Sequence, residues 1–229
     1  ALKKCKAVSY VSPMSESQEG FFIFTNEVTN LQYMEFIYYL KNNNRAEELR
    51  VAELDTMNWV MADVENPRSY VENYHRRPEH PVVNVSQEGA KAFCKWLGEI
   101  WNGQQDDYLV EFKLPTQVQW KHAYQGGKDQ HKYPWGGSEI TNSKECYLAH
   151  VKDCGNGEGP AKTYTYSPND FGLYNVSGNV SEWISSENTS CGGNWHSDPE
   201  DATAKSTLIS DQSSVYIGFR PIMTFQPRK

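Results

Sequence analysis

Oxygen-bearing side chains within residues 172–183, GLYNVSGNVSEW, are spaced as a cation-binding turn would space them. Asn175 and Glu182 carry side-chain oxygens, and Gly178 lets the backbone turn tightly enough for carbonyl oxygens to point inward. A hard cation such as calcium prefers a cage of oxygen ligands with at least one carboxylate. The alternative is structural, with Asn175 and Glu182 capping the turn by hydrogen bonds to backbone amides.

The other residues that could bind a metal or act as nucleophiles are scattered. There is no CxxC pair, and no HxxxH or HExxH spacing among the histidines His75, His80, His122, His131, His150 and His196. His196 and Ser197 are adjacent, but no GxSxG motif supports a hydrolase. Cys94 is typical of a small buried hydrophobic residue. Cys146 and Cys154 flank a loop that a disulfide could close, or both are free thiols, and spacing alone does not choose between these.

The composition limits the class of protein. The chain has 229 residues, enough for one large domain with a sizeable core. Charged residues make up 22% and the net charge is −7, which argues against nucleic acid as a partner. No segment approaches the roughly 20 apolar residues of a membrane-spanning helix. We predict a single domain over residues 1–229, without internal repeats or low-complexity linkers.

Three helices are predicted from caps and apolar stripes. Thr29 and Gln32 form a capping box before one helix, and Thr116 and Gln119 form a second box before another. Ser86 caps the clearest helix, which continues to residue 101. Short strands are expected at residues 21–24, 108–114, 180–184 and 215–221. Residues 45–80 are polar, and we expect an irregular surface excursion there. These elements predict an α+β domain with two or three helices around small antiparallel sheets and much loop.

The turn at residues 172–183 resembles the GLYNxxGNxxEW signature of the formylglycine-generating enzyme family, also called the sulfatase-modifying factor family. Other blocks resemble that family in the expected order: residues 27–33 (EVTNLQY), 81–97, 113–127 (KLPTQVQWKHAYQGG), 133–136 (YPWG), 192–195 (GGNW) and 218–221 (GFRP). The resemblance runs from about residue 20 to residue 221. It implies an irregular α+β fold related to C-type lectins. It also implies one calcium ion held by side-chain oxygens of Asn175 and Glu182 and by carbonyls of Gly178 and Val180, and it favours calcium over the structural alternative.

The resemblance fails at the residues that carry the enzyme's chemistry. In the enzymes, a GGSYxC block and a second cysteine five residues later hold Cu(I), a soft ion that selects thiolates. Here the corresponding positions are Ser197 and Ala202, so no copper is expected. Cys191 lies six residues before Ser197, and a rescue by Cys191 and His196 would need a rebuilt loop. We therefore lean against an enzyme and expect no formylglycine-generating activity.

The sequence leaves two functions open. The first is a non-catalytic binding or structural module of a bacterial extracytoplasmic protein, and the start around Lys3 and Cys5 would suit a lipoprotein whose leader has been removed. Its ligand, a protein, peptide or glycan, would lie in a groove bordered by Trp195, His196 and Ser197, with Trp195 as an aromatic platform. The second is a metal-dependent oxidoreductase of the same fold with a different active site near His196. A structural alternative for Trp195 is burial beneath residues 45–80.

Overall fold

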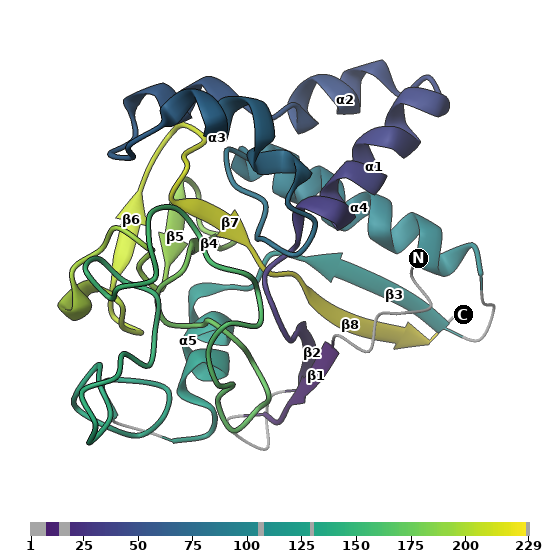
Figure 1. Cartoon of the computed structure of the whole chain (residues 1–229). Coiled ribbons are helices and arrows are strands. Elements are labelled where there is room, and N and C mark those ends of the chain that lie inside the picture. The colour runs from purple at the N-terminus through teal and green to yellow at the C-terminus, as the bar shows by residue number, and fades with distance from the viewer. Residues whose placement is uncertain (1–7, 14–18, 105–107, 129–130, 228–229) are drawn as a thin grey trace.

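Two small sheets form the frame of the domain in the computed structural model, which describes residues 8–13, 19–104, 108–128 and 131–227 (Figure 1). Lys3 and Cys5 lie outside the described residues. The first sheet is antiparallel, in the order β1 (Val8–Val11), β2 (Phe21–Phe24), β8 (Ile222–Pro227) and β3 (Tyr108–Lys113). The second has the order β6 (Thr207–Ile209), β5 (Thr189–Cys191), β4 (Ser181–Trp183) and β7 (Ile217–Phe219). Strands β4 and β7 run parallel, which differs from the antiparallel prediction.

The three predicted helices are present with their caps. Both capping boxes form, at Thr29 and Gln32 before α1 (Asn30–Asn42) and at Thr116 and Gln119 before α5 (Gln117–Gln125). Ser86 caps α4 (Gln87–Asn102) by accepting a hydrogen bond from the Gly89 backbone N–H at 3.0 Å. The apolar stripe of α4 packs with β2, β3 and β7 in the largest buried cluster of the described residues, which includes Phe93, Leu97, Phe112 and Phe219. Local sequence signals were sufficient for these elements because each cap lies within three residues of its partner.

The prediction of an irregular excursion at residues 45–80 is wrong. This segment forms α2 (Ala46–Ala52), η2 (Thr56–Met61), α3 (Pro67–Asn73) and η3 (Tyr74–Arg76), so the described residues contain five α-helices rather than two or three. Asn66 caps α3 and Pro67 stands at its start, where a missing N–H has no cost. Trp59 and Tyr74 are 1% and 3% exposed because they pack into a cluster with Trp195. Tertiary burial of these rings orders the segment.

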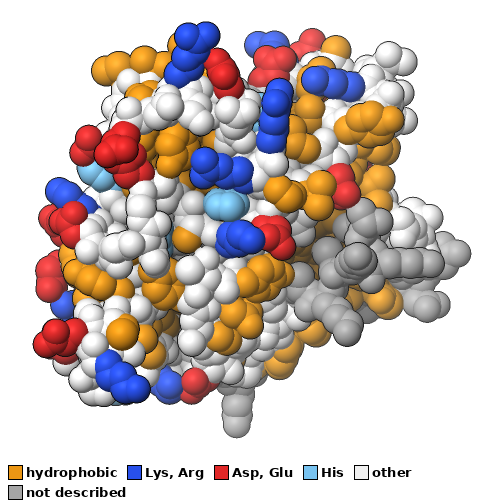
Figure 2. Space-filling model, in the orientation of Figure 1, with side chains coloured by type: hydrophobic (Ala, Val, Ile, Leu, Met, Phe, Trp, Pro, Cys, Tyr) orange, Lys and Arg blue, Asp and Glu red, His pale blue; other side chains and the backbone are white. Residues whose placement is uncertain are grey.

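The α+β architecture is confirmed, and much of the chain between α5 and β4 is loop. Within the described residues, no helix is both long and apolar enough to pass through a bilayer. Figure 2 shows Lys and Arg side chains interspersed with Asp and Glu on the face drawn, without a continuous basic stripe of the kind that binds nucleic acid.

Candidate functional site

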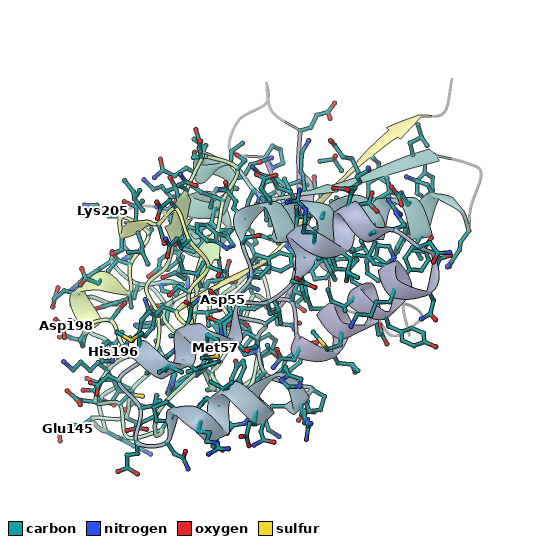
Figure 3. All side chains as sticks on the ribbon, turned by 90° about the horizontal axis from the view of Figure 1, so that it is seen from above. Asp55, Met57, Glu145, His196, Asp198 and Lys205 are labelled. Atoms are coloured by element: carbon teal, nitrogen blue, oxygen red, sulfur yellow. The ribbon has the colours of Figure 1, made fainter. Side chains whose placement is uncertain are left out.

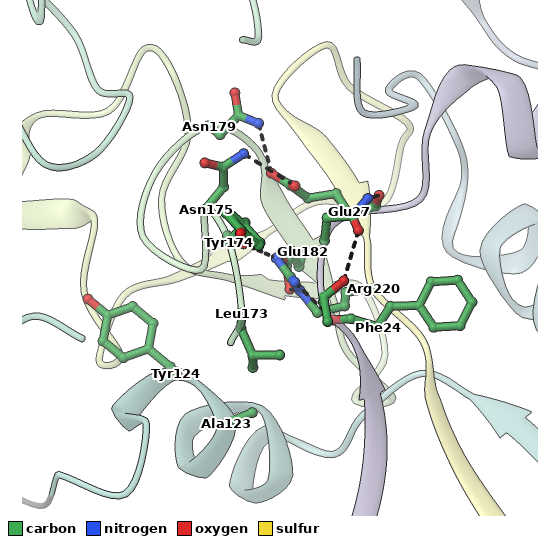
Figure 4. Close-up of polar contacts among 12 residues, drawn as sticks. Phe24, Glu27, Ala123, Tyr124, Leu173, Tyr174, Asn175, Asn179, Glu182 and Arg220 are labelled. Carbon is green, nitrogen blue, oxygen red and sulfur yellow. Dashed lines mark hydrogen bonds and ion pairs between the residues drawn. The ribbon is translucent and has the colours of Figure 1, made fainter. Parts of the chain in front are cut away.

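Arg220 occupies the junction of the two sheets. It directly follows β7, and only Pro221 separates it from β8. Arg220 therefore links the second sheet to the first. Its guanidinium is fully buried and donates to the carbonyl oxygens of Phe24 on β2 at 3.0 Å and of Tyr174 at 2.7 Å. It also forms a bidentate contact with the Glu182 carboxylate, with the shortest distance 2.8 Å (Figure 4). One side chain thus fastens β2, β4 and the loop at residue 174 together.

The oxygens of Glu182 are already occupied. Glu182 is 1% exposed on β4, and besides Arg220 it accepts a hydrogen bond from the indole N–H of Trp120 at 2.7 Å. Burial works to lower the pKa of Arg220, but the Glu182 carboxylate outweighs it, so that pKa is raised and the guanidinium stays charged. A carboxylate with a guanidinium at hydrogen-bond distance has its charge compensated. A calcium ion at Glu182 would have to displace Arg220 or share a buried site with its positive charge.

Asn175 and Asn179 face a different carboxylate, that of Glu27, which was not among the predicted site residues. The Asn179 amide donates to Glu27 at 2.7 Å, and the Asn175 amide lies at 3.4 Å from the other Glu27 oxygen (Figure 4). Both asparagines have left-handed backbone conformations, with φ of 52° and 62°. Asparagine tolerates this region better than other non-glycine residues, which gives a backbone reason for both residues besides metal binding. The signal that could have revealed Glu27 is an acidic residue three positions after a buried strand.

Glu27 has an unusual protonation equilibrium. It is fully buried, and burial raises its pKa from 4.5 to about 7, with the Arg220 charge acting in the opposite direction. Arg220 is already matched by Glu182, so little compensation is left for a second carboxylate. The buried cluster therefore holds one carboxylate paired with Arg220, that of Glu182, and one acid with a pKa of about 7, Glu27.

The described arrangement does not fit the calcium site predicted at Asn175, Gly178, Val180 and Glu182. Glu182 binds Arg220 and Trp120, whereas Asn175 turns its amide N–H toward Glu27. Gly178 has a close-packing role, because a Cβ there would lie 2.3 Å from the His150 carbonyl oxygen. The Asn175 Oδ1 atom is buried without a hydrogen-bond partner among the described atoms, so this predicted ligand atom is unengaged. Within the described part of the chain, no group of three or more His, Cys, Asp or Glu side chains could hold a metal ion.

Ser197 and Ala202, the residues that the resemblance places at the family's two thiol positions, both make structural contacts. The Ser197 hydroxyl accepts a hydrogen bond from the Asn194 backbone N–H at 3.0 Å, and the Ser197 carbonyl accepts one from the Lys152 N–H at 3.0 Å. Ala202 is fully buried, and its carbonyl accepts hydrogen bonds from the hydroxyls of Tyr124 at 3.0 Å and Ser177 at 2.6 Å. This loop, residues 192–202, is closed by its own turn and by contacts to residues 124, 152 and 177.

The expectation that Trp195 forms an exposed aromatic platform is wrong. Its side chain is 5% exposed, its ring stacks on Trp59 with centroids 6.3 Å apart, and its indole N–H donates to the Val215 carbonyl at 3.2 Å. The 45–80 segment supplies Trp59 and therefore covers this part of the predicted groove. Figure 3 looks down on this side of the molecule, with Met57 of the segment and His196 of the loop labelled.

His196 and Ser197 are partly exposed, and they remain the groove candidates. The His196 ring stacks on Tyr216, with centroids 5.5 Å apart and planes at 26°. Cys191 lies elsewhere, 1% exposed on β5 in an apolar cluster, and burial raises the pKa of its thiol to about 11. A buried thiol of that kind does not provide the reactive thiolate that the proposed rescue with His196 would need. Cys146 and Cys154 are both free thiols.

The order of the sequence blocks between residues 27 and 221, and the fold that they form, agree with a known family. The family described as sulfatase-modifying factor enzyme 1-like domain matches residues 9–225. The chain belongs to this family. The predicted resemblance is thereby confirmed over almost the whole chain.

Some relatives of this chain are named as enzymes and others as inactive proteins. A formylglycine-generating enzyme of Thermomonospora curvata is 36% identical over 135 residues, covering 56% of this chain and 39% of that protein. An inactive C-alpha-formylglycine-generating enzyme 2 of Bos taurus is 32% identical over 115 residues, covering 48% of this chain and 34% of that protein. The chain thus spans less than half the length of either relative.

The solved structure titled Treponema denticola variable protein 1 has the same fold. Its TM-score is 0.60 at 17% identity, covering 94% of this chain and 91% of that one. At that identity the likeness concerns the fold alone.

Proposed function

We propose that this domain is a non-catalytic binding or structural module that keeps the fold of the formylglycine-generating enzymes without their thiol chemistry. The observation that carries the proposal is the state of residues 197 and 202. Ser197 uses its hydroxyl to close the turn at Asn194, and Ala202 is fully buried with no heteroatom on its side chain. A hydroxyl is a hard neutral ligand and a methyl group is none, so this pair offers Cu(I) no thiolate. The relative from Bos taurus, whose name calls it inactive, supports a non-catalytic member of the family.

The second candidate function, a metal-dependent oxidoreductase with a different site, has weaker support. It requires histidines and carboxylates gathered around His196. The ring neighbours of His196 are Trp195 and Tyr216, which are not metal ligands of the required kind. The described residues elsewhere also lack a cluster of three or more metal-binding side chains. The geometry therefore favours the first candidate.

A turnover assay tests the proposal. The purified domain is incubated with Cu(I), oxygen and a peptide containing CxPxR, and conversion of the peptide cysteine to an aldehyde is followed by mass spectrometry. We expect no aldehyde above the control without protein. The formylglycine-generating enzyme of Thermomonospora curvata serves as the positive control. Turnover by this chain above background would overturn the proposal.

The ligand and the cellular location are parts of the same proposal. We propose a protein, peptide or glycan ligand that contacts the partly exposed His196 and Ser197, and a location outside the cytoplasm of a bacterium. Peptide and glycan arrays with the wild type and with His196→Ala test the first part. His131→Ala is the matched control because His131 is exposed and lies in a different loop. Equal array signals for all three proteins would exclude this surface, and recovery of the native protein in the cytoplasmic fraction would exclude the location.

A further inference from the structure

Cys154 and His150 form a thiol–imidazole pair at the edge of the loop that contains residues 151–160. The Cys154 Sγ atom lies 3.2 Å from His150 Nδ1. His150 is 1% exposed, and its other ring nitrogen, Nε2, lies 2.9 Å from the carbonyl oxygen of Gly159. A carbonyl oxygen only accepts, so Nε2 must carry the hydrogen. In the neutral ring Nδ1 is then the acceptor, and it faces the thiol that can give up its proton.

Other contacts hold this pair in place. The backbone of residue 150 is fixed because the His150 carbonyl accepts a hydrogen bond from the Asn179 N–H at 2.7 Å. The far side of the loop is fixed because the Tyr70 hydroxyl donates to the Glu158 carbonyl at 2.7 Å. The Tyr166 hydroxyl donates to the Cys154 sulfur at 3.7 Å, which adds a second polar contact to the thiol. The imidazole is therefore oriented before any reaction begins, as an efficient base must be.

The residue that carries the thiol is also partly exposed. Cys154 is half-buried, and the following residues 155–158 are exposed. A Cβ added at Gly155 or Gly157 would meet no atom within 4 Å, so the loop after Cys154 is open at both glycines. The charged neighbours Lys152 and Asp153 are both exposed and of opposite sign. The Lys152 N–H donates to the Ser197 carbonyl, which places this segment against the loop that lacks the family's thiols.

We propose that Cys154 is the reactive thiol of this domain and that it undergoes thiol–disulfide exchange with small-molecule disulfides, with His150 as the base. The thiol proton moves to His150 Nδ1, and the Cys154 thiolate attacks one sulfur of the disulfide. A new bond from Cys154 Sγ to that sulfur forms as the old sulfur–sulfur bond breaks, and the electron pair leaves with the other sulfur. The leaving thiolate takes the proton from His150. Cys154 is oxidised to a mixed disulfide and the released sulfur is reduced to a thiol, so no further oxidant is needed.

The exchange modifies each Cys154 thiol once and is not a catalytic turnover. It requires no copper, so its outcome does not depend on whether the domain has formylglycine-generating activity. Partial burial raises the pKa of Cys154, but the thiolate form is stabilised by a hydrogen bond from Nδ1 of His150 once it holds the thiol proton and by one from the Asn156 backbone N–H, and together with the other contacts these lower that pKa to about 7. A thiol of pKa ~7 is about half thiolate at pH 7, against ~3% for an ordinary thiol of pKa ~8.5, and lower intrinsic nucleophilicity removes part of that advantage.

The test follows each cysteine separately in the native protein. The wild type reacts with glutathione disulfide for short times between pH 5.5 and 9, and mixed disulfides at each cysteine are measured by peptide mapping. Cys146 is the internal comparison because it is exposed and its thiol contacts only a backbone carbonyl among the described residues. We expect Cys154 to react about 3-fold faster than Cys146 at pH 7 and about 6-fold faster at pH 6, with a midpoint near pH 7. The buried Cys94 and Cys191 should stay unmodified, which reports that the fold is intact.

Two variants separate the imidazole from the rest of the site. In His150→Gln the ratio of Cys154 to Cys146 rates at pH 6 should fall to about 1 or below. Tyr166→Phe removes one hydroxyl contact and should shift the Cys154 midpoint upward by less than the His150 substitution does. If His150→Gln exposes Cys94 and is therefore unfolded, the wild-type profile decides alone. A Cys154 rate no greater than that of Cys146 at pH 6, or a Cys154 midpoint near that of an ordinary thiol, would overturn the proposal.

Discussion

The junction around Arg220 and the loop of residues 192–202 both lie in motif blocks of the family, yet they have different fates in this chain. At the junction, the guanidinium and its acceptors are complete, with Glu182, Phe24 and Tyr174 all within 3.0 Å. In the loop, Ser197 and Ala202 stand where the resemblance places the family's two thiols, and their contacts close the turn and join the loop to its neighbours. The motif residues of the junction hold two sheets together, whereas the thiols of the loop serve a reaction. On the proposed non-catalytic role, this chain keeps the fold of the family without its reaction.

The largest effect is expected at the junction. Arg220→Met leaves the Glu182 carboxylate buried without its partner, and we expect a loss of about 3–5 kcal/mol in the free energy of unfolding. Urea unfolding measures it. Arg68→Met is the control, because Arg68 forms an exposed ion pair with Glu72 and should change stability by less than about 1 kcal/mol. Adding Glu182→Gln to Arg220→Met should recover part of the loss, since the buried charge is removed.

The same experiment distinguishes Arg220 from calcium as the cation at Glu182. With the guanidinium in place, a chelator or excess calcium should leave the unfolding midpoint of the wild type unchanged. A calcium-dependent rise would show a bound ion that stabilises the folded state by mass action. Such a rise, lost in Glu182→Gln, would restore the calcium prediction and break the contrast between junction and loop.

A pH-dependent effect is expected at Glu27. Its pKa in the folded protein is about 7, above the value of 4.5, so the folded state holds the proton more tightly than the unfolded state does. The stability contributed by protonated Glu27 is complete below pH 4.5 and is lost as the pH rises through 7, with a total on the order of 3 kcal/mol. Glu27→Gln does not titrate, so the difference between the two proteins should change by that amount across this window. Parallel pH profiles would mean that folding does not raise the pKa of Glu27.

The packing of Trp59 on Trp195 should contribute less to the free energy of unfolding than Arg220 does. Trp59→Phe removes part of the surface that packs on Trp195, and we expect a loss of about 1–2 kcal/mol together with greater acrylamide quenching of Trp195. The Trp195 signal is obtained by subtracting Trp195→Phe variants in each background. Trp135→Phe is the control because Trp135 stacks on Tyr133 in another part of the molecule. If Trp195 is fully quenched in the wild type, the groove is open and the predicted aromatic platform stands.

The sequence predicted local features well and long-range ones poorly. The capping boxes at Thr29 and Thr116 could be read because both partners lie within one turn of helix. The pair of Glu182 and Arg220 is separated by 38 residues, and nothing local shows that these two side chains meet. Ordering of residues 45–80 depends on Trp59 reaching Trp195, which is 136 positions away along the chain. Apolar periodicity and helix caps predict neither contact. Both contacts form only because the loops bring segments that are distant in the sequence together.

The smallest effect is expected within the loop itself. Ser197→Ala removes the acceptor of the Asn194 N–H and should cost about 0.5–1.5 kcal/mol in urea unfolding, while Ser143→Ala, at an exposed serine, should be neutral. Ser197→Cys restores the family's residue type, but sulfur accepts a hydrogen bond weakly, so this variant should lose nearly as much stability as Ser197→Ala. It should also gain no firm Cu(I) binding, because Ala202 supplies no second thiolate. A Ser197→Cys variant that binds Cu(I) tightly without loss of stability would show that the loop still has the geometry of the enzymes. The loop would then differ from that of the enzymes only in the side chains at residues 197 and 202, and not in its backbone.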